Sequence, residues 1–426
     1  MSLNTLITLI IVVVTYGFII FGKKNKAVIT FGLALVIAAM KLVEGLEPEN
    51  ISRVIDLDTL GLLTGMMIIV AFLNSSGFFE YFSIKVIKFG GERFYFTLTL
   101  LMVVVALTSA FLDNVVTIIV MAPMMFLIAD LLDMDPVPLI MLTLVIDNIG
   151  GGATLIGSPF NLVLGSISGF SFNDFIIKLG PASILVFMVL MLYFKKHIKV
   201  DASIISNIKK LDEMDENKAI TDWKMMRVSL AVFLAVIILF VIHTVIGVEL
   251  SYIALLGGIV LLLVNKKGFD HVSDKIDWDM LFFFAGLYII SHALESIGIT
   301  ELMANGLLHF QDSQLMMLII PFALAAIFVP ILNNVPAALI FGPVFRILVG
   351  FGFSTMIWWA FAISGNFATS LTPLGAVQNI VAITYLEREI GRSFGFKEYV
   401  RWMIMPVTIS LVIGLLYILG LFAISK

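Results

Sequence analysis

Apolar runs of about 20 residues recur along the whole chain, and each is long enough to cross a bilayer core of about 30 Å as a helix. They lie at about 3–21, 27–46 and 59–79 in the first half and at about 225–246, 250–265 and 278–297 in the second. The longest polar stretch, residues 195–224, lies between these two sets. The pattern predicts an all-α polytopic membrane protein built from two halves.

The two halves repeat each other in sequence. The stretch "IDLDTLGLLTGMMIIVAFLNSSGFFE" (Ile55–Glu80) aligns without a gap to "IDWDMLFFFAGLYIISHALESIGITE" (Ile276–Glu301). The polar and glycine identities are Asp56/Asp277, Asp58/Asp279, Gly65/Gly286, Ser75/Ser296, Gly77/Gly298 and Glu80/Glu301. Random alignment of apolar helices gives few matches of this kind. We predict a first repeat over 1–194, a linker over 195–224 and a second repeat over 225–426.

Lysines and arginines near the span ends predict the orientation, because they favour the cytoplasmic side. Lys23, Lys24 and Lys26 place the first loop inside, and Lys195, Lys196, Lys199, Lys209 and Lys210 place the linker inside. The first spans of the two halves then begin on opposite sides of the membrane. We therefore expect an inverted repeat in the cell inner membrane, with a cytoplasmic linker and both termini extracytoplasmic.

A polar motif interrupts one apolar segment in each half. The spacing N-x5-T-x2-G-x3-N occurs at Asn148, Thr154, Gly157 and Asn161, and again at Asn366, Thr372, Gly375 and Asn379. The first copy lies in "DNIGGGATLIGSPFN", whose glycines include Gly151. Irregular backbone at membrane depth must be buried in protein or face a water-filled cavity. We predict spans broken at about 138–170 and 358–384, with helix N-termini that suit an anion and carbonyls that suit a cation.

A second paired element precedes each predicted break. "SAFLDNVVTIIVMAP" (Ser109–Pro123) corresponds to "VPILNNVPAALIFGP" (Val329–Pro343), which places Asn114 over Asn334. Apolar arms flank each polar tip, over about 95–132 and 315–350. The arms could be full spans or re-entrant hairpins, and charge counting does not separate the two. We favour re-entrant hairpins, so each half has about five spans, including one broken helix, and one hairpin.

Two aspartates lie within the apolar segments of the first half. Asp113 precedes Asn114 at the first tip, where the second tip has Asn333, and Asp147 opens the first break. A carboxylate inside the membrane is a functional hypothesis by default. We expect Asp113 and Asp147 to carry a coupling proton or cation, with helix capping as the alternative for each.

The candidate substrate and ion site combines the tips and the breaks. A lone Asn, Thr or Gly in a membrane helix is more often a packing contact, but here the positions recur in both halves. The candidates are Asp113, Asn114, Thr117, Asn148, Gly151, Thr154, Asn161, Asn333, Asn334, Asn366, Thr372, Gly375 and Asn379.

The amino-acid composition argues against several classes of function. The chain is 60% hydrophobic and 13% charged, with a mean hydropathy of +1.09 and a net charge of −4, so no basic face suggests nucleic acid. The absence of cysteine excludes disulfides and thiolate metal sites. We expect no cofactor and no metal site. The glycine-rich stretch lacks the Lys-Ser/Thr ending of a P-loop, and no His-Glu-x-x-His motif occurs, so an enzyme is not expected.

The motifs resemble those of the ion transporter superfamily. "SAFLDNVVTIIVMAP" followed by "DNIGGGATLIGSPFNLVLG" is similar to the branch with arsenite permeases, NhaD-type sodium/proton antiporters and the pink-eyed-dilution melanosomal protein. "NNVPAAL" and "SLTPLGAVQNIVAI" resemble arsenite permeases. The resemblance implies scaffold and transport subdomains, elevator-like alternating access and often a homodimer. It also suggests a cytosolic ATPase subunit as a partner.

The function expected from this resemblance is proton-coupled efflux of arsenite or antimonite. Sodium-coupled dicarboxylate members carry Ser-Asn-Thr at both tips, which this chain lacks, so that subgroup is disfavoured. Sodium/proton antiport of the NhaD type and transport of another small anion are the alternatives among transporters. An ion channel is the alternative outside that class.

Overall fold

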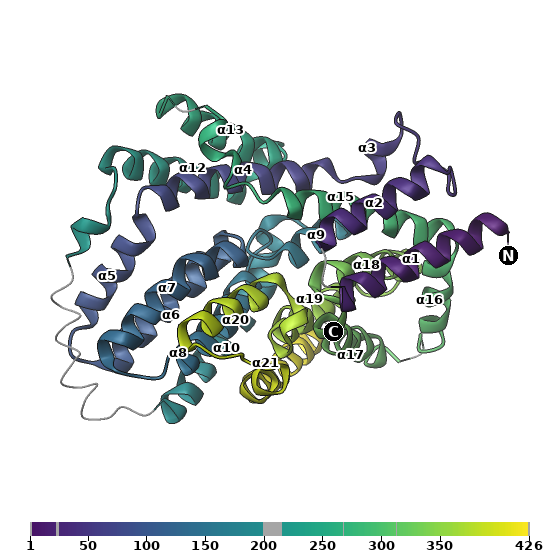
Figure 1. Cartoon of the computed structure of the whole chain (residues 1–426). Coiled ribbons are helices and arrows are strands. Elements are labelled where there is room, and N and C mark those ends of the chain that lie inside the picture. Colours follow the sequence, from purple (N-terminus) through teal and green to yellow (C-terminus); the bar gives the residue numbers. More distant parts are fainter. Residues whose placement is uncertain (1, 23–24, 199–214, 267, 312, 425–426) are drawn as a thin grey trace.

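The computed structural model describes residues 2–22, 25–198, 215–266, 268–311 and 313–424, and in these ranges the regular elements are all helices (Figure 1). Lys23 and Lys24, and the linker lysines at 199, 209 and 210, lie outside the described residues. The predicted orientation partly depends on these five lysines. The all-α class predicted from the sequence is confirmed.

The first half contains ten helices in the described ranges. They are α1 (Leu3–Phe21), α2 (Lys26–Ala39), α3 (Ile51–Val54), α4 (Leu57–Ser75), α5 (Phe78–Gly90), α6 (Phe94–Phe111), α7 (Asn114–Leu132), α8 (Pro136–Gly151), α9 (Pro159–Ser168) and α10 (Phe172–His197).

The second half repeats this order of long and short helices. Its elements are η1 (Glu216–Ala219), α12 (Trp223–Ile246), α13 (Leu250–Val264), α14 (Asp270–Ser273), α15 (Trp278–Ser296), α16 (Ile299–Leu308), α17 (Met316–Leu332), α18 (Asn334–Gly350), α19 (Met356–Ala368), η2 (Thr369–Leu371), η3 (Pro373–Gly375), α20 (Val377–Ile390) and α21 (Phe396–Ile424).

Seven described helices are long and apolar enough to cross a membrane, namely α1, α4, α6, α7, α10, α12 and α21. The pair α15 and α16 also passes this test as one span, with a bend of 65° between the two helices. Shorter apolar helices, including α8 and α9 on the two sides of the first break, complete the set. The chain is therefore a polytopic membrane protein.

One expected span is shorter in the structure. The run at 27–46 forms a helix only to Ala39, because Lys41 and Gly45 adopt positive φ angles of 50° and 82°. A left-handed residue cannot continue a right-handed α-helix. The end of this apolar run is therefore a turn, and α2 is a short scaffold helix.

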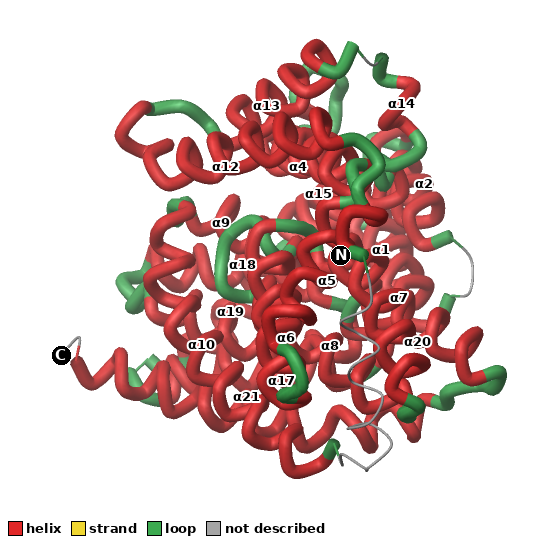
Figure 2. The backbone as a smooth tube through the Cα atoms, turned by 90° about the vertical axis from the view of Figure 1, so that its left-hand side faces the viewer, coloured by secondary structure: helices red, strands yellow, loops and turns green. Residues whose placement is uncertain are grey.

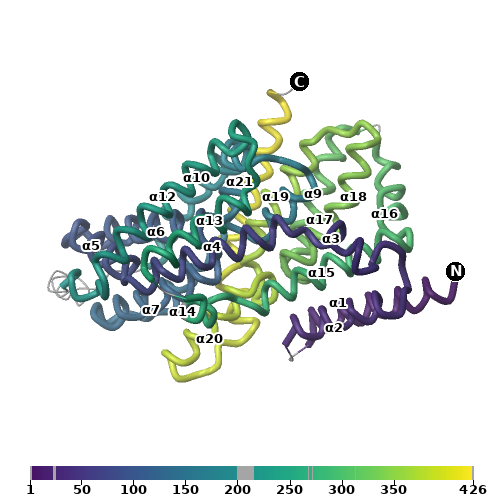
Figure 3. The backbone as a smooth tube through the Cα atoms, turned by 90° about the horizontal axis from the view of Figure 1, so that it is seen from above, coloured from purple at the N-terminus to yellow at the C-terminus, as the bar shows by residue number. Residues whose placement is uncertain are grey.

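The helices form two layers. Figure 1 shows α4, α12 and α13 as a layer above the bundle that contains α6–α10 and α17–α21, and Figure 2 shows the same layer at the top after a quarter turn. Seen from above, α4, α12 and α13 run side by side across the bundle (Figure 3). We call α1–α4 and α12–α15 the scaffold, and α6–α10 with α17–α21 the tip-and-break unit.

Within the scaffold, each half packs its long helix against the other half. Helix α4 packs against α13, and α15 packs against α2. Gly65 on α4 allows the first approach, because a Cβ there would overlap the backbone of Ala254. Gly286 does the same on α15, where a Cβ would lie 2.8 Å from the Cα of Phe31. The Gly65/Gly286 identity thus reflects one equivalent helix contact made twice.

The scaffold helices also start in equivalent ways. Asp56 caps α4 by accepting from the N–H of Asp58 at 3.0 Å, and Asp277 caps α15 by accepting from the N–H of Met280 at 2.9 Å. Side-chain caps of this kind pair backbone donors that have no partner inside the helix. The repeated Asp-x-Asp motif therefore has a structural role in both halves.

We predict that Gly65→Ala and Gly286→Ala each destabilise the protein by about 1–3 kcal/mol, the usual cost of overpacking. Gly32→Ala is the matched control, since a Cβ at Gly32 meets no described atom within 4 Å. Thermal unfolding of purified protein in detergent measures the effect. If both scaffold variants melt at the same temperature as Gly32→Ala, the close-packing assignment is wrong.

Candidate functional site

Two unwound segments face each other inside the tip-and-break unit. The first break joins α8 to α9 over residues 152–158, and the second joins α19 to α20 through η2 and η3. Pro159 starts α9 after the first break, and Pro373 starts η3 within the second, positions where a missing N–H costs nothing. Most residues of the first break are buried, and those of the second are buried or partly buried, so their backbone groups need partners within the protein.

Asparagine amides pair the two breaks across the repeats. Asn366 donates from Nδ2 to Oδ1 of Asn161 at 2.7 Å, and Asn148 donates from Nδ2 to Oδ1 of Asn379 at 3.3 Å. Asn148 and Asn366 are equivalent in the repeat, as are Asn161 and Asn379. The two bonds are therefore the same contact made in opposite directions. All four side chains are buried.

The receiving asparagines also hold the unwound backbone of their own repeat. Asn161 donates to the carbonyl oxygens of Gly152 at 3.2 Å and Thr154 at 2.7 Å. Asn379 donates to the carbonyl oxygens of Thr369 at 2.9 Å and Thr372 at 3.0 Å. Each amide thus closes a break and accepts a bond from the other repeat.

The hairpin tips pack directly on the breaks. The Thr154 hydroxyl donates to the carbonyl oxygen of Ala110 at the first tip, and Thr372 Oγ1 donates to that of Pro330 at the second at 2.5 Å. At the second tip, Asn333 Nδ2 also donates to the carbonyl oxygen of Leu374 at 3.3 Å. Tips and breaks therefore form one packed unit in each repeat.

Glycines leave room for these contacts. A Cβ at Gly151 would overlap Oδ1 of Asn114, and a Cβ at Gly375 would overlap the carbonyl oxygen of Thr369. Gly151 thus faces the first tip, while Gly375 lies against its own break. Thr117, on α7, donates its hydroxyl to the carbonyl oxygen of Asp113, the residue that caps this helix.

The two aspartates have different local roles. Asp113 caps α7 by accepting from the N–H of Val115 at 2.8 Å, while its Oδ2 is buried and has no hydrogen-bond partner among the described residues. Asp147 lies inside α8, so it is not a cap, and neither of its buried carboxylate oxygens has a partner in the described part of the chain. Ser109 Oγ lies 2.6 Å from the backbone oxygen of Asp147 and 2.7 Å from Oδ1 of Asn114.

Gln378 is a buried polar residue that the motif analysis missed. Its Nε2 donates to Oδ1 of Asn148 at 2.8 Å. The equivalent position in the first repeat is Phe160, whose ring fills the space over Gly365. The contrast between Phe160 and Gln378 directly before Asn161 and Asn379 is the sequence signal that could have identified it.

A cavity of about 360 Å³ lies between the scaffold and the tip-and-break unit. Asn333, Asn334 and Gln378 line it, whereas Asn114, Asn148 and Asn366 are not on its wall. Asn25, Lys26, Asp277 and Asp279 line it from the scaffold side.

Six helices begin at the wall of this cavity. They are α2 at Lys26, α7 near Val115, α9 at Pro159, α15 after Asp277, α18 at Asn334 and α20 at Val377. Side chains cap α2, α7 and α15, through Asn25, Asp113 and Asp277. At α9, α18 and α20 the capping residue makes no such bond. At α18, however, the N–H of Val335 bonds to Oδ1 of Asn334 at 2.8 Å. The N-termini of α9 and α20 therefore leave backbone N–H groups and positive dipole ends at the cavity wall.

A second cavity of about 560 Å³ lies near the other end of α15. It is lined by Asp56 and Asp58 at the start of α4, and by Tyr288 and Glu295 on α15. Glu295 forms an ion pair of 2.8 Å with Arg346 of α18, which joins the scaffold to the tip-and-break unit. The two cavities therefore lie between the scaffold and the tip-and-break unit, one near each end of α15.

Comparisons with known proteins agree with this architecture. A family model described as a citrate transporter matches residues 16–363. A 46 kDa membrane protein of Mycobacterium leprae is 30% identical over 425 residues, which cover 97% of this chain and 98% of that protein. The human P protein is 24% identical over 490 residues, which cover 95% of this chain and 58% of that protein.

The fold also matches a solved structure. The YdaH transporter of Alcanivorax borkumensis superimposes with a TM-score of 0.62 at 14% identity, over 100% of this chain and 99% of that one. At this identity the likeness concerns the fold alone. The P protein match confirms the resemblance to pink-eyed-dilution proteins. From the family model and the 30% identical relative, the chain belongs to the citrate transporter family of the ion transporter superfamily and is a membrane transporter.

Proposed function

We propose that the chain is a proton-coupled secondary transporter of a small oxyanion or its oxyacid, with efflux of arsenite or antimonite as the first candidate. The observation that carries the coupling is the pair of buried aspartates at the first tip and break. Three of their four carboxylate oxygens have no hydrogen-bond partner among the described residues. A buried carboxylate without a partner is stable only when it holds a proton or a cation.

Helix N-termini support the oxyanion class. Two N-termini without a side-chain cap, those of α9 and α20, begin at the wall of the 360 Å³ cavity. Backbone N–H groups and positive dipole ends at a helix start form a ready anion site. The amides of Asn333 and Asn334 add donors at the same wall. A hydroxyl-rich neutral acid would use the same donors together with the amide oxygens.

Citrate or a similar carboxylate is the second candidate. The family model that matches the chain is described as a citrate transporter. Lys26 adds one side-chain cation to the cavity wall, which also carries the carboxyl groups of Asp277 and Asp279. A volume of about 360 Å³ falls within the usual range of small-molecule sites. The absence of Ser-Asn-Thr at the tips keeps this candidate second.

An elevator-like motion fits the division into two bodies. The amide pairs join the two breaks, and the breaks hold the tips, so the tip-and-break unit would move as one body against the scaffold. The two cavities near different ends of α15 would then give access from the two membrane faces. The proposal also includes a cytoplasmic linker, extracytoplasmic termini and re-entrant hairpins. It includes a homodimer as the assembly, and a cytosolic ATPase subunit as a partner to be tested. No catalytic role is proposed.

Flux into proteoliposomes tests the proposal. Vesicles with an imposed proton gradient or an imposed sodium gradient would be given arsenite, antimonite or citrate, one solute at a time. We expect uptake of one of these solutes to follow the proton gradient. Sodium-driven loss of the proton gradient, with no flux of any solute, would instead establish sodium/proton exchange and overturn the oxyanion proposal.

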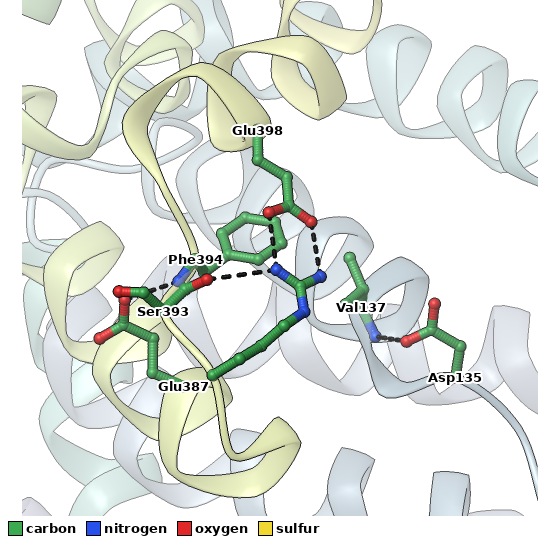
Figure 4. Close-up of polar contacts among 7 residues, drawn as sticks. Asp135, Val137, Glu387, Ser393, Phe394 and Glu398 are labelled. Atoms are coloured by element: carbon green, nitrogen blue, oxygen red, sulfur yellow. Dashed lines mark hydrogen bonds and ion pairs between the residues drawn. The ribbon is translucent and has the colours of Figure 1, made fainter.

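We predict that Asp113→Asn and Asp147→Asn each abolish coupling of flux to the proton gradient. The amide keeps the size of the side chain but cannot release a proton. Proton-driven flux in proteoliposomes is the measurement, and Asp135→Asn is the matched control. Asp135 is exposed and caps α8 by accepting from the N–H of Val137 at 3.0 Å (Figure 4). Asp113 caps α7 in the same way.

The control separates capping from coupling, because asparagine is as good a cap as aspartate. Asp135→Asn should transport like the unmodified protein. Full proton coupling in both Asp113→Asn and Asp147→Asn would remove these residues from the mechanism.

We also predict that Gly151→Ala stops flux while the protein still folds. The added Cβ would overlap Oδ1 of Asn114 and would lie 2.7 Å from the carbonyl oxygen of Gly157, so the tip could not rest on the break. Gly180→Ala is the control, because its Cβ would meet only Ile176 at 4.0 Å. Flux is compared per monodisperse protein recovered by gel filtration. Equal flux in the two variants would show that the approach of tip and break is not needed for transport.

A further inference from the structure

Two short helices connect the scaffold to the tip-and-break unit. Helix α5 follows α4 and leads to α6, and α16 follows α15 and leads to α17. Each begins after a glycine with positive φ, Gly77 at 79° and Gly298 at 81°. Glycine adopts this conformation without strain, so both positions are suited to a hinge. By sequence and backbone the two connections are equivalent.

The end of the linker covers one of these hinges. Thr221 donates from its N–H to the carbonyl oxygen of Ser76 at 3.1 Å and from Oγ1 to that of Ser75 at 2.6 Å. A Cβ at Gly77 would overlap the carbonyl oxygen of Ala219. A Cβ at Gly298 would meet no described atom within 4 Å. The first hinge is therefore enclosed, and no described atom encloses the second.

The same segment also holds the far end of α5. Residues 216–222, which we call the strap, run beside this helix, and η1 within the strap packs against it. Glu216 forms an ion pair with Lys88 in the last turn of α5. Near the first turn, the ring of Tyr81 lies edge-on to Trp223 at 5.5 Å. The strap and the start of α12 therefore contact α5 at both ends.

The strap belongs to the scaffold. Asp222 caps α12 by accepting from the N–H of Met225 at 2.9 Å, and α12 packs against α4 and α13. The Lys88–Glu216 ion pair thus joins the scaffold to the end of α5 that leads into the first hairpin. Any movement of that hairpin relative to the scaffold that tilts α5 about Gly77 would separate the pair.

We propose that the strap is a latch that holds α5, and with it the tip-and-break unit, in the present position. The Lys88–Glu216 contact opens when the unit moves. At the second connection no described atom covers the hinge at Gly298, and the ion pair between scaffold and unit is Glu295–Arg346. This inference depends on the elevator-like motion of the proposed function, but it does not depend on the substrate. The strap restrains α5 in the first repeat but not α16 in the second, although the glycine hinges of the two helices are equivalent.

A reporter that needs no substrate tests the latch. The chain contains no cysteine, so Ile380→Cys places one thiol on the wall of the 360 Å³ cavity. Ile380 is 40% exposed. The rate at which a maleimide dye labels this thiol in nanodiscs reports how often the cavity is open. Lys88→Glu and Glu216→Lys are introduced into this background singly and together.

Each single reversal should slow labelling by about twofold to fivefold, the effect expected of one exposed ion pair. The double reversal should restore the rate, which a folding defect would not do. Lys397→Glu is the control, because it reverses the charge of an exposed lysine on α21, outside α5 and the strap. It should leave the rate nearly unchanged.

If no solute is transported but the labelling rates change as predicted, the proposed substrate is rejected and the latch is supported. Unchanged labelling in both single reversals, or no restoration in the double reversal, would overturn the latch.

Discussion

The structure depends on one constraint, that unwound backbone inside an apolar protein must find its hydrogen-bond partners within the protein. Asn161 and Asn379 meet it by donating to the carbonyl oxygens of the breaks. Their own oxygens accept from Asn366 and Asn148 of the opposite repeat. Neither break is therefore complete without the other half of the chain. The same bonds join both breaks, and the tips that rest on them, into one body.

The repeats share this framework but differ in chemistry. The equivalents of Asp113 and Asp147 in the second half are Asn333 and Gly365, neither of which is ionisable. The framework supplies two equivalent arrangements, one from each half. The carboxylates belong to one repeat only, so a proton or cation would be held on one side of the shared core. The strap at α5 adds a second asymmetry, in the connections to the scaffold.

Much of this framework could be predicted from the sequence. The spacing of Asn148, Thr154, Gly157 and Asn161 and its copy at Asn366–Asn379 located both breaks, because glycine and amide residues are unusual in apolar spans. The tips at Asn114 and Asn334 followed from the same reasoning.

What could not be predicted depends on contacts between distant segments. The choice of partner for each asparagine, the bond from Gln378 to Asn148 and the covered hinge at Gly77 all arise from packing across the two halves. The length of α2 was wrong because hydropathy does not register the left-handed conformation of Lys41. Capping and coupling remained alternatives for Asp147 until its position inside α8 excluded a cap.

Proton exchange on substrate binding tests the central claim most directly. Calorimetric titration of the purified protein with the transported oxyanion, repeated in buffers of different ionisation enthalpy, gives the number of protons exchanged with the buffer. The account predicts that about one proton is exchanged per oxyanion bound, since the binding and the protonation of the buried carboxylates are linked. It also predicts that this exchange disappears when Asp113 and Asp147 are both replaced by asparagine. Binding without proton exchange, or the same exchange in the doubly substituted protein, would contradict it.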